Sequence, residues 1–227
     1  MLADWPNGTL AEYSLAPVEA VTPAHGLDHI DAAHLAAVSR CIIPFGGLLR
    51  GRLAAGETLL VTGATGAYGT AALLLAVAMG AARVVAAGRN RAVLDEVAKA
   101  GGPRVVTVVL KGDPVADATA LRAAAGGGAH MAFDMVGNAG DPNATLAALN
   151  SLRRGGRLVL MGSMTTTLPV PYTMLMLNSW EILGQFMYPA SAYRRLLELL
   201  RSGLLDLSAI QPRLYPLADL PQAMEAA

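Results

Sequence analysis

The chain has 227 residues, of which 54% are hydrophobic and 15% are charged, and its formal net charge at pH 7 is +0. This composition is typical of a packed globular protein and excludes a disordered chain. A balanced charge gives no general attraction for nucleic acid or for an anionic membrane surface, so we expect neither as a partner.

The number of cysteines and the length of the apolar runs limit which covalent and metal sites the chain can form and where in the cell it is expected. Cys41 is the single cysteine, which excludes an intrachain disulfide and a multi-cysteine zinc site within the chain. The N-terminus lacks the basic start and apolar core of a secretory signal. The longest apolar run, residues 71–87, is interrupted by Gly80 and Arg83 and is shorter than a spanning helix. We therefore expect a cytoplasmic protein.

The first 45 residues do not have the pattern of a complete domain. Residues 10–15 predict one strand, and residues 31–39 predict a short Ala-rich helix with Asp31 near its start. A second helix is expected over residues 45–53, before the first core strand.

From Thr58 onward, apolar strand patterns alternate regularly with helical patterns. Strands are predicted at 58–62, 83–87, 104–109, 131–135, 157–161 and 181–186. Helices are predicted at 67–79, 91–100, 115–125, 142–152 and 190–202. The strand runs are apolar on both faces, as in parallel strands that helices cover on both sides. The pattern predicts an α/β fold, a doubly wound parallel six-stranded sheet of the Rossmann type in the order 3-2-1-4-5-6.

The motif that organises the chain is a glycine turn between the first core strand and the first core helix. Its glycines are spaced as Gly63-x-x-Gly66-x-x-Gly69. Glycines let the backbone bend sharply and approach a pyrophosphate, and the helix start presents free N–H groups and the positive end of its dipole. In this strand–turn–helix–strand context, the motif predicts a dinucleotide site formed by Thr65, Gly66, Ala67, Tyr68 and Gly69.

The end of the second strand bears on the choice between NAD and NADP. An NAD site usually has Asp or Glu here to hold the ribose hydroxyls, whereas this chain has Gly88, Arg89 and Asn90. Arg89 can pair with a 2′-phosphate through its planar fork, which favours NADP(H). The alternative is a solvated arginine that opens the next helix, with Asn90 as the N-cap.

Later strand ends supply candidates for the nicotinamide half. Ligands in open α/β sheets lie beyond the carboxyl ends of the strands, so we expect contacts at Val136, Gly137, Gly162, Ser163 and Phe186. The glycines are equally explained as ordinary strand-to-loop residues. Asp134 is a candidate for either a structural carboxylate or a catalytic one, and Tyr68 and Tyr188 for either lining the pocket or packing.

The histidines give no metal site. His25 and His29 are four residues apart, but Gly26 between them and Pro23 before them disfavour a helix that presents both on one face. A third ligand at matching spacing is not evident. We interpret them as surface or linker residues, and Cys41 as a small buried hydrophobe.

Taken together, the collinear motifs resemble the medium-chain dehydrogenase/reductase superfamily. They are Gly8 to Tyr13, Gly56-Glu57-Thr58, the glycine turn, and Gly155 to Gly162. The chain looks most like the zinc-free, quinone-oxidoreductase-like relatives of alcohol dehydrogenases. This resemblance implies NADP(H)-dependent hydride transfer to or from a carbonyl, alcohol, enone or quinone, and a homo-oligomer. The apolar character of the last strand and its loop, residues 184–188, favours a small, hydrophobic substrate.

The resemblance also implies a division of the chain. Residues 1–45 would be part of a GroES-like substrate domain and a linker, residues 46–203 the NADP(H)-binding domain, and residues 204–227 a return segment toward the substrate domain. Most of the substrate domain would then be absent from the sequence, and no catalytic residue is assigned.

The rival enzyme class is the short-chain dehydrogenases, whose glycine pattern also matches. Some 60 residues precede the turn here, and the residues four before Lys99 and Lys111 are Asp95 and Thr107, so the Tyr-x-x-x-Lys pair is excluded. Two functions remain: an NADP(H)-dependent oxidoreductase, or a truncated NADP(H)-binding module or subunit without turnover.

Overall fold

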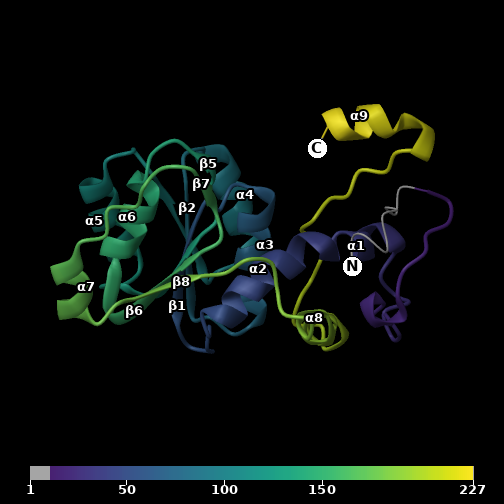
Figure 1. Ribbon diagram of the computed structural model, residues 1–227, viewed down its shortest axis with the longest axis horizontal. Coiled ribbons are helices and arrows are strands. Elements are labelled where there is room, and N and C mark those ends of the chain that lie inside the picture. Colours follow the sequence, from purple (N-terminus) through teal and green to yellow (C-terminus); the bar gives the residue numbers. More distant parts are fainter. Residues whose placement is uncertain (1–10, 227) are drawn as a thin grey trace.

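The computed structural model describes residues 11–226, and its body is one parallel sheet between two layers of helices (Figure 1). The six strands of the sheet are β1 (Thr58–Thr62), β2 (Arg83–Gly88), β3 (Val105–Val109), β4 (Ala129–Asp134), β6 (Leu152–Leu160) and β8 (Glu181–Gly184). Their order is β3-β2-β1-β4-β6-β8, and every neighbouring pair is parallel. The predicted sheet, its strand order and its fold class are confirmed.

Two hydrophobic layers cover the two faces of the sheet. On one face lie α2 (Val38–Arg50), α3 (Ala67–Ala78), α4 (Arg91–Gly101) and α8 (Ala192–Arg201). On the other lie α5 (Pro114–Ala124), α6 (Asn143–Asn150) and, at the far end, α7 (Tyr172–Asn178). Side chains alternate along each strand, so Leu59 and Val61 join the first layer and Leu60 joins the second.

The helix starts follow from local sequence. Asn90 precedes α4 and accepts the Val93 N–H at 3.3 Å, whereas Asp113 precedes α5 and accepts the N–H groups of Val115 and Ala116. These side chains satisfy N–H groups that a helix end leaves without a partner, which fixes where each helix begins. The N-cap interpretation of Asn90 is therefore confirmed.

The helices before the sheet differ from the expectation. In place of helices at 31–39 and 45–53, the structure has the short α1 (Ala32–Ala36) and then α2, which continues through Pro44 to Arg50. Cys41 and Leu48 are fully buried in the first layer, and this packing overrides the local cost of a proline. The domain boundary expected at residues 45 and 46 falls inside α2, and the division into domains stays a prediction.

The predicted strand at residues 10–15 is wrong for its described part, since residues 11–15 are in neither a strand nor a helix; Leu10 lies outside the described residues. Tyr13 is 90% exposed, and without a neighbouring strand the backbone of this segment gains no ladder hydrogen bonds. Sequence reasoning also missed α7 and the small parallel pair of β5 (Gly137–Ala139) and β7 (Ser163–Met164).

The described segments before α1 and after α8 lie on the same side of the body, to the right of the sheet in Figure 1. Short helical turns at Val18–Ala20 and Leu217–Asp219 and the helix α9 (Leu220–Glu225) lie in these segments. Among the described residues, one helical stretch, Ala32–Arg50, has the length and apolar composition to cross a membrane. Its apolar residues belong to the core that α3 and α8 share, which accounts for its hydropathy.

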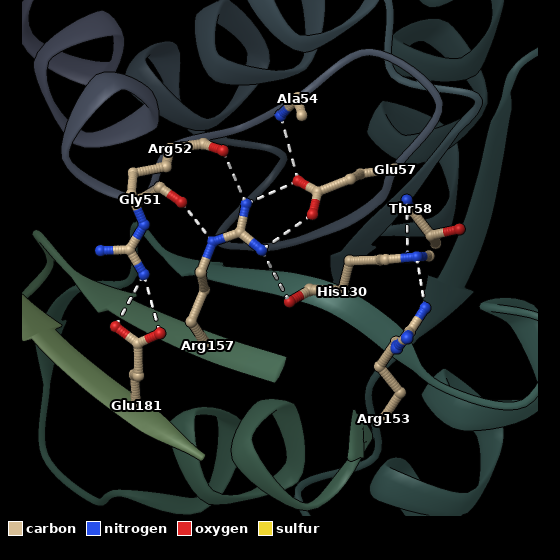
Figure 2. Close-up of polar contacts among 9 residues, drawn as sticks. All are labelled: Gly51, Arg52, Ala54, Glu57, Thr58, His130, Arg153, Arg157 and Glu181. Carbon is tan, nitrogen blue, oxygen red and sulfur yellow. Dashed lines mark hydrogen bonds and ion pairs between the residues drawn. The ribbon is translucent and has the colours of Figure 1, made fainter. Parts of the chain in front are cut away.

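A buried ion pair fastens the entry to β1 against the sheet, at the edge where the strands begin (Figure 2). The Arg157 guanidinium on β6 lies 2.5 and 3.0 Å from the Glu57 carboxylate oxygens, and it also donates to the carbonyls of Gly51, Arg52 and His130. Only 9% of the Arg157 side chain and 19% of the Glu57 side chain are exposed. All donors of the arginine fork therefore have partners, as a buried charge requires.

Burial alone would raise the pKa of Glu57. Hydrogen bonds from Arg157 and the Ala54 N–H, with the positive charge of Arg157, outweigh that effect and hold this pKa below its ordinary value of 4.5. Because the pKa is lowered in the folded state, the stabilisation is present above pH 4.5 and is lost as pH falls through the folded-state pKa.

We predict that Arg157→Met lowers the free energy of unfolding by about 3 kcal/mol, because it leaves the Glu57 carboxylate buried without its partner. Urea unfolding at pH 7 measures the loss. The double variant Glu57→Gln, Arg157→Met should recover part of it, and a double variant as unstable as the sum of the single ones would contradict this. Glu57→Gln should also flatten the loss of stability below pH 4.5.

Candidate functional site

The glycine turn brings the start of α3 directly against the end of β1. Gly63 has a φ of +68°, a conformation that favours glycine, and an added Cβ there would lie 2.7 Å from the Met135 carbonyl oxygen. At Gly69, an added Cβ would collide with the Gly63 carbonyl and lie 2.8 Å from the Ala64 Cα. These two glycines are therefore required by the fold itself.

Gly66, the middle glycine, is different. Its φ is −84°, and an added Cβ would lie 3.4 Å from the Gly63 oxygen, which is ordinary contact. The fold therefore has room for a side chain at a position that lines an open cleft. The fold does not require glycine at this position beside a helix start. A glycine here is explained if the protein backbone must approach a ligand closely.

The two ends of α3 differ in the side-chain hydrogen bonds that they receive. No side chain caps its N-terminus at Gly66. At the other end, the Arg104 guanidinium donates to the carbonyl oxygens of Val77 and Ala81 at 3.0 and 2.9 Å. The positive end of the helix dipole at the cleft therefore has no side-chain cap within residues 11–226.

The end of β2 offers a cation and no carboxylate. An added Cβ at Gly88 would lie 2.8 Å from the Thr65 Cγ2, so glycine at this position leaves room for the Thr65 side chain. Arg89 is exposed, and within residues 11–226 it forms no ion pair or side-chain hydrogen bond. Its guanidinium is therefore available to a ligand.

These residues line one cleft of about 620 Å³ at the carboxyl ends of the strands. Of the candidate cofactor residues, the cleft is lined by Thr65, Gly66, Gly88, Arg89, Val136 and Gly137. The structure thus brings together the glycine turn, the end of β2 and the end of β4, as parallel strands that end at one edge require.

The same cleft has a residue that sequence reasoning left without a role. Lys111, just after β3, also lines it and is exposed. The signal that could have found it is the rule already used for Arg89: Lys111 follows a strand whose carboxyl end lies at the same edge of the sheet.

Beyond β4, the chain is held by a buried carboxylate. Asp134 is 3% exposed, and its oxygens accept the hydroxyls of Thr62 and Thr145 at 2.9 Å and the Val136 N–H at 3.2 Å. Both oxygens are engaged in fixing the turn that lines the cleft. This geometry favours the structural alternative for Asp134.

Gly162 and Ser163 reach this edge through the pairing of β5 with β7. The Ser163 N–H donates to the Val136 carbonyl at 3.0 Å, and its hydroxyl accepts the Asn138 N–H at 3.0 Å. An added Cβ at Gly162 would collide with the Val136 oxygen, so the two strand ends are in close contact. These residues border the turn at Val136 and do not line the cleft described above.

The remaining candidates lie outside that cleft. Ala67, Tyr68 and Gly69 form the first turn of α3, and the Tyr68 ring is 44% exposed. The side chain of Asn90 is engaged as the α4 N-cap, and Phe186, after β8, is 89% exposed. Tyr188 packs edge-on against Tyr193, with ring centres 5.6 Å apart. Of the two roles considered for Tyr188, this contact favours packing over lining the pocket.

A parallel sheet of this order with a glycine turn at the start of its first core helix defines a dinucleotide-binding Rossmann domain. The model of the family described as zinc-binding dehydrogenase matches residues 67–202. The chain belongs to this family, within the medium-chain dehydrogenase/reductase superfamily.

Among curated relatives, a putative D-xylulose reductase of Agrobacterium fabrum is 30% identical over 192 residues, covering 85% of this chain and 53% of the relative. An L-threonine 3-dehydrogenase of Anaeromyxobacter dehalogenans is 28% identical and covers 96% of this chain and 60% of the relative. A thermostable alcohol dehydrogenase from Pyrobaculum aerophilum has a TM-score of 0.67 at 25% identity, over 86% of this chain and 54% of that one. The chain spans about half the length of the relatives it matches.

The family name implies zinc, and the described residues do not fit a zinc site. Within residues 11–226, no group of three or more His, Cys, Asp or Glu side chains is placed to hold a metal ion. Cys41 is fully buried, and burial raises the pKa of its thiol to about 11, which disfavours the thiolate that a metal needs. Its prediction as a small buried hydrophobe is confirmed, and His25 and His29 are exposed, as expected.

We predict that alanine at one glycine of the turn mainly lowers stability, whereas alanine at another mainly weakens dinucleotide binding. Gly69→Ala should lower the free energy of unfolding by about 2–3 kcal/mol, because its Cβ collides with the Gly63 backbone. Gly66→Ala should cost less than about 1 kcal/mol, yet weaken dinucleotide binding at least about tenfold, because its methyl group lies where the pyrophosphate approaches. Urea unfolding and fluorescence titration with NADPH measure the two effects. Unchanged NADPH affinity in Gly66→Ala would contradict this placement of the pyrophosphate.

Proposed function

We propose that the chain is an NADP(H)-dependent oxidoreductase that transfers hydride to or from a carbonyl, alcohol, enone or quinone. The observation that carries the proposal is the end of β2, where Gly88 replaces a carboxylate and Arg89 stands exposed at the cleft. A carboxylate there would repel a 2′-phosphate, whereas an arginine without an ion-pair partner attracts it.

The residues of the chain would divide the cofactor between them. The first turn of α3, from Gly66 to Gly69, would hold the pyrophosphate, and Gly88, Arg89 and Asn90 the adenosine half. Val136, Gly137, Gly162, Ser163 and Phe186 would border the nicotinamide half. Bound NADPH supplies the hydride, and the protein supplies position and electrostatics.

The remaining expectations are part of the same proposal. An exposed Phe186 and a half-exposed Met187 after β8 support a small, hydrophobic substrate near that edge. We propose a homo-oligomer, in line with the family resemblance, in the cytoplasm, and a reaction without zinc, in line with the buried thiol of Cys41. The balanced net charge of +0 supports no role for nucleic acid or membrane.

A second candidate function is NADP(H) binding without turnover. The described cleft is lined by no His, Tyr, Cys or Glu, and both of its carboxylates accept backbone N–H groups. Among the described residues that line this cleft, Arg89 and Lys111 are thus the titratable side chains not engaged in a hydrogen bond or ion pair, and the second candidate assigns them a binding role only.

Turnover assays separate the two candidates. The chain is assayed for NADPH oxidation with aldehydes, enones and quinones, and for NADP⁺ reduction with alcohols, polyols and L-threonine. The first proposal expects turnover with at least one of these classes. Tight NADPH binding with no turnover across the panel would contradict it and support the binding module.

We predict that Arg89→Gln weakens NADPH binding about 10–100-fold and NADH binding less than about twofold, because only NADPH carries the 2′-phosphate that the arginine would bind. Fluorescence titration gives both dissociation constants. Arg91→Gln is the matched control, since Arg91 is nearby and exposed but lies 3.7 Å from Asp95 as an ion pair and does not line the cleft. An equal loss for the two cofactors would contradict the role of Arg89.

A further inference from the structure

The turn after β3 is held rigidly against the end of β2. The buried Asp117 carboxylate accepts the Lys111 N–H at 2.9 and 3.1 Å and the Gly112 N–H at 2.9 Å. Asn143 donates to the Gly112 carbonyl at 3.1 Å, which fixes the turn from the side of α6. The backbone position of Lys111 is therefore determined by the fold.

Strand register brings this turn next to Arg89. Gly88 pairs with Val109, and the Leu110 N–H donates to the Gly88 carbonyl at 2.8 Å. Neighbouring strands are about 4.8 Å apart, so the residues that follow the two strands begin close together. Both Arg89 and Lys111 line the cleft, and their long side chains can approach one anion there.

The positive charge of Lys111 is not used elsewhere in the described chain. Within residues 11–226, Lys111 forms no ion pair and no side-chain hydrogen bond. The two acidic residues of the cleft are engaged with backbone groups: Asp117 with the β3 turn and Asp141 with the Asn143 N–H, at 2.9 Å. The cleft thus presents two exposed cations from adjacent strand ends.

We propose that Lys111 is a second phosphate-binding cation, which acts with Arg89 to select a dinucleotide that carries a 2′-phosphate. The inference rests on the proposed function, since it names a further specificity residue of the same site. A phosphate monoester carries a charge of about −1.5 to −2 at neutral pH, which one arginine does not balance. Arg89 supplies a planar fork for two oxygens, and Lys111 supplies a compact charge for the third.

The experiment compares Lys111→Gln with wild type by fluorescence titration with NADPH and NADH. Competition with adenosine 2′,5′-bisphosphate and 5′-AMP isolates the adenosine half. We expect Lys111→Gln to weaken NADPH and the bisphosphate about tenfold, and NADH and 5′-AMP less than about twofold. Lys99→Gln is the matched control, because Lys99 is the other lysine of the chain and lies on α4 outside the cleft.

The double variant Arg89→Gln, Lys111→Gln completes the cycle. If both cations hold one phosphate, the double variant should bind NADPH and NADH with nearly equal affinity, and the two single effects should not simply add. This result, with an unchanged Lys99→Gln control, supports the proposal.

Other outcomes overturn one proposal or both. Wild-type preference for NADPH with no effect of Lys111→Gln, or with equal losses for NADPH and NADH, overturns the role of Lys111 and leaves the NADP(H) assignment standing. Equal affinity of wild type for NADPH and NADH overturns both the 2′-phosphate preference and this inference. Urea unfolding of Lys111→Gln confirms that any loss of binding occurs in a folded chain.

Discussion

The contact between Gly69 and the backbone of Gly63 sets how closely α3 approaches β1, and the site depends on that distance. Because no Cβ separates the two, the helix begins directly at the edge where the strands end. Its first N–H groups then face the same space as the ends of β2, β3 and β4. A helix held a few ångströms farther away would direct the same groups into solvent, and the residues at the strand ends would have no anchored ligand to select.

The opposite edge of the sheet is fastened by charge. Arg157 and Glu57 join the entry of β1 to β6, and the guanidinium also donates to the carbonyls of Gly51 and Arg52, the first two residues after α2. The entry of β1 is thus fixed at the edge where the strands begin, and the start of α3 is fixed at the edge where they end. The edge proposed to bind the dinucleotide has glycines and two cations, Arg89 and Lys111, that form no ion pair within residues 11–226, whereas the opposite edge has its buried charges paired.

The regular part of the fold could be predicted from sequence because it rests on local signals. Apolar runs, caps such as Asn90 and the glycine spacing fixed the six strands, their order and five helices within a few residues. The continuity of α2 through Pro44 could not be predicted, since it depends on the burial of Cys41 and Leu48 by distant helices.

The site was predictable to a similar extent. Arg89 follows a recognisable motif at a known spacing, so its place in the cleft could be expected. Lys111 has only the weaker signal that it follows a strand ending at the same edge, and its place in the cleft depends on contacts from Asp117 and Asn143 and on strand register. Phe186, which follows the last strand, is exposed and does not line the cleft, so its contact with the nicotinamide half stays a prediction.

The unequal ends of α3 have a thermodynamic consequence. Arg104 donates to carbonyls at and just beyond the C-terminal end, while no side chain caps the N-terminal end, so an anion bound there as proposed would add to the stability of this helix. By mass action, a ligand that binds only the folded chain raises its unfolding free energy by RT ln(1 + [L]/Kd), about 2.7 kcal/mol at a hundredfold excess over Kd. If the dinucleotide binds as proposed, the folded population of this chain rises with the concentration of free dinucleotide.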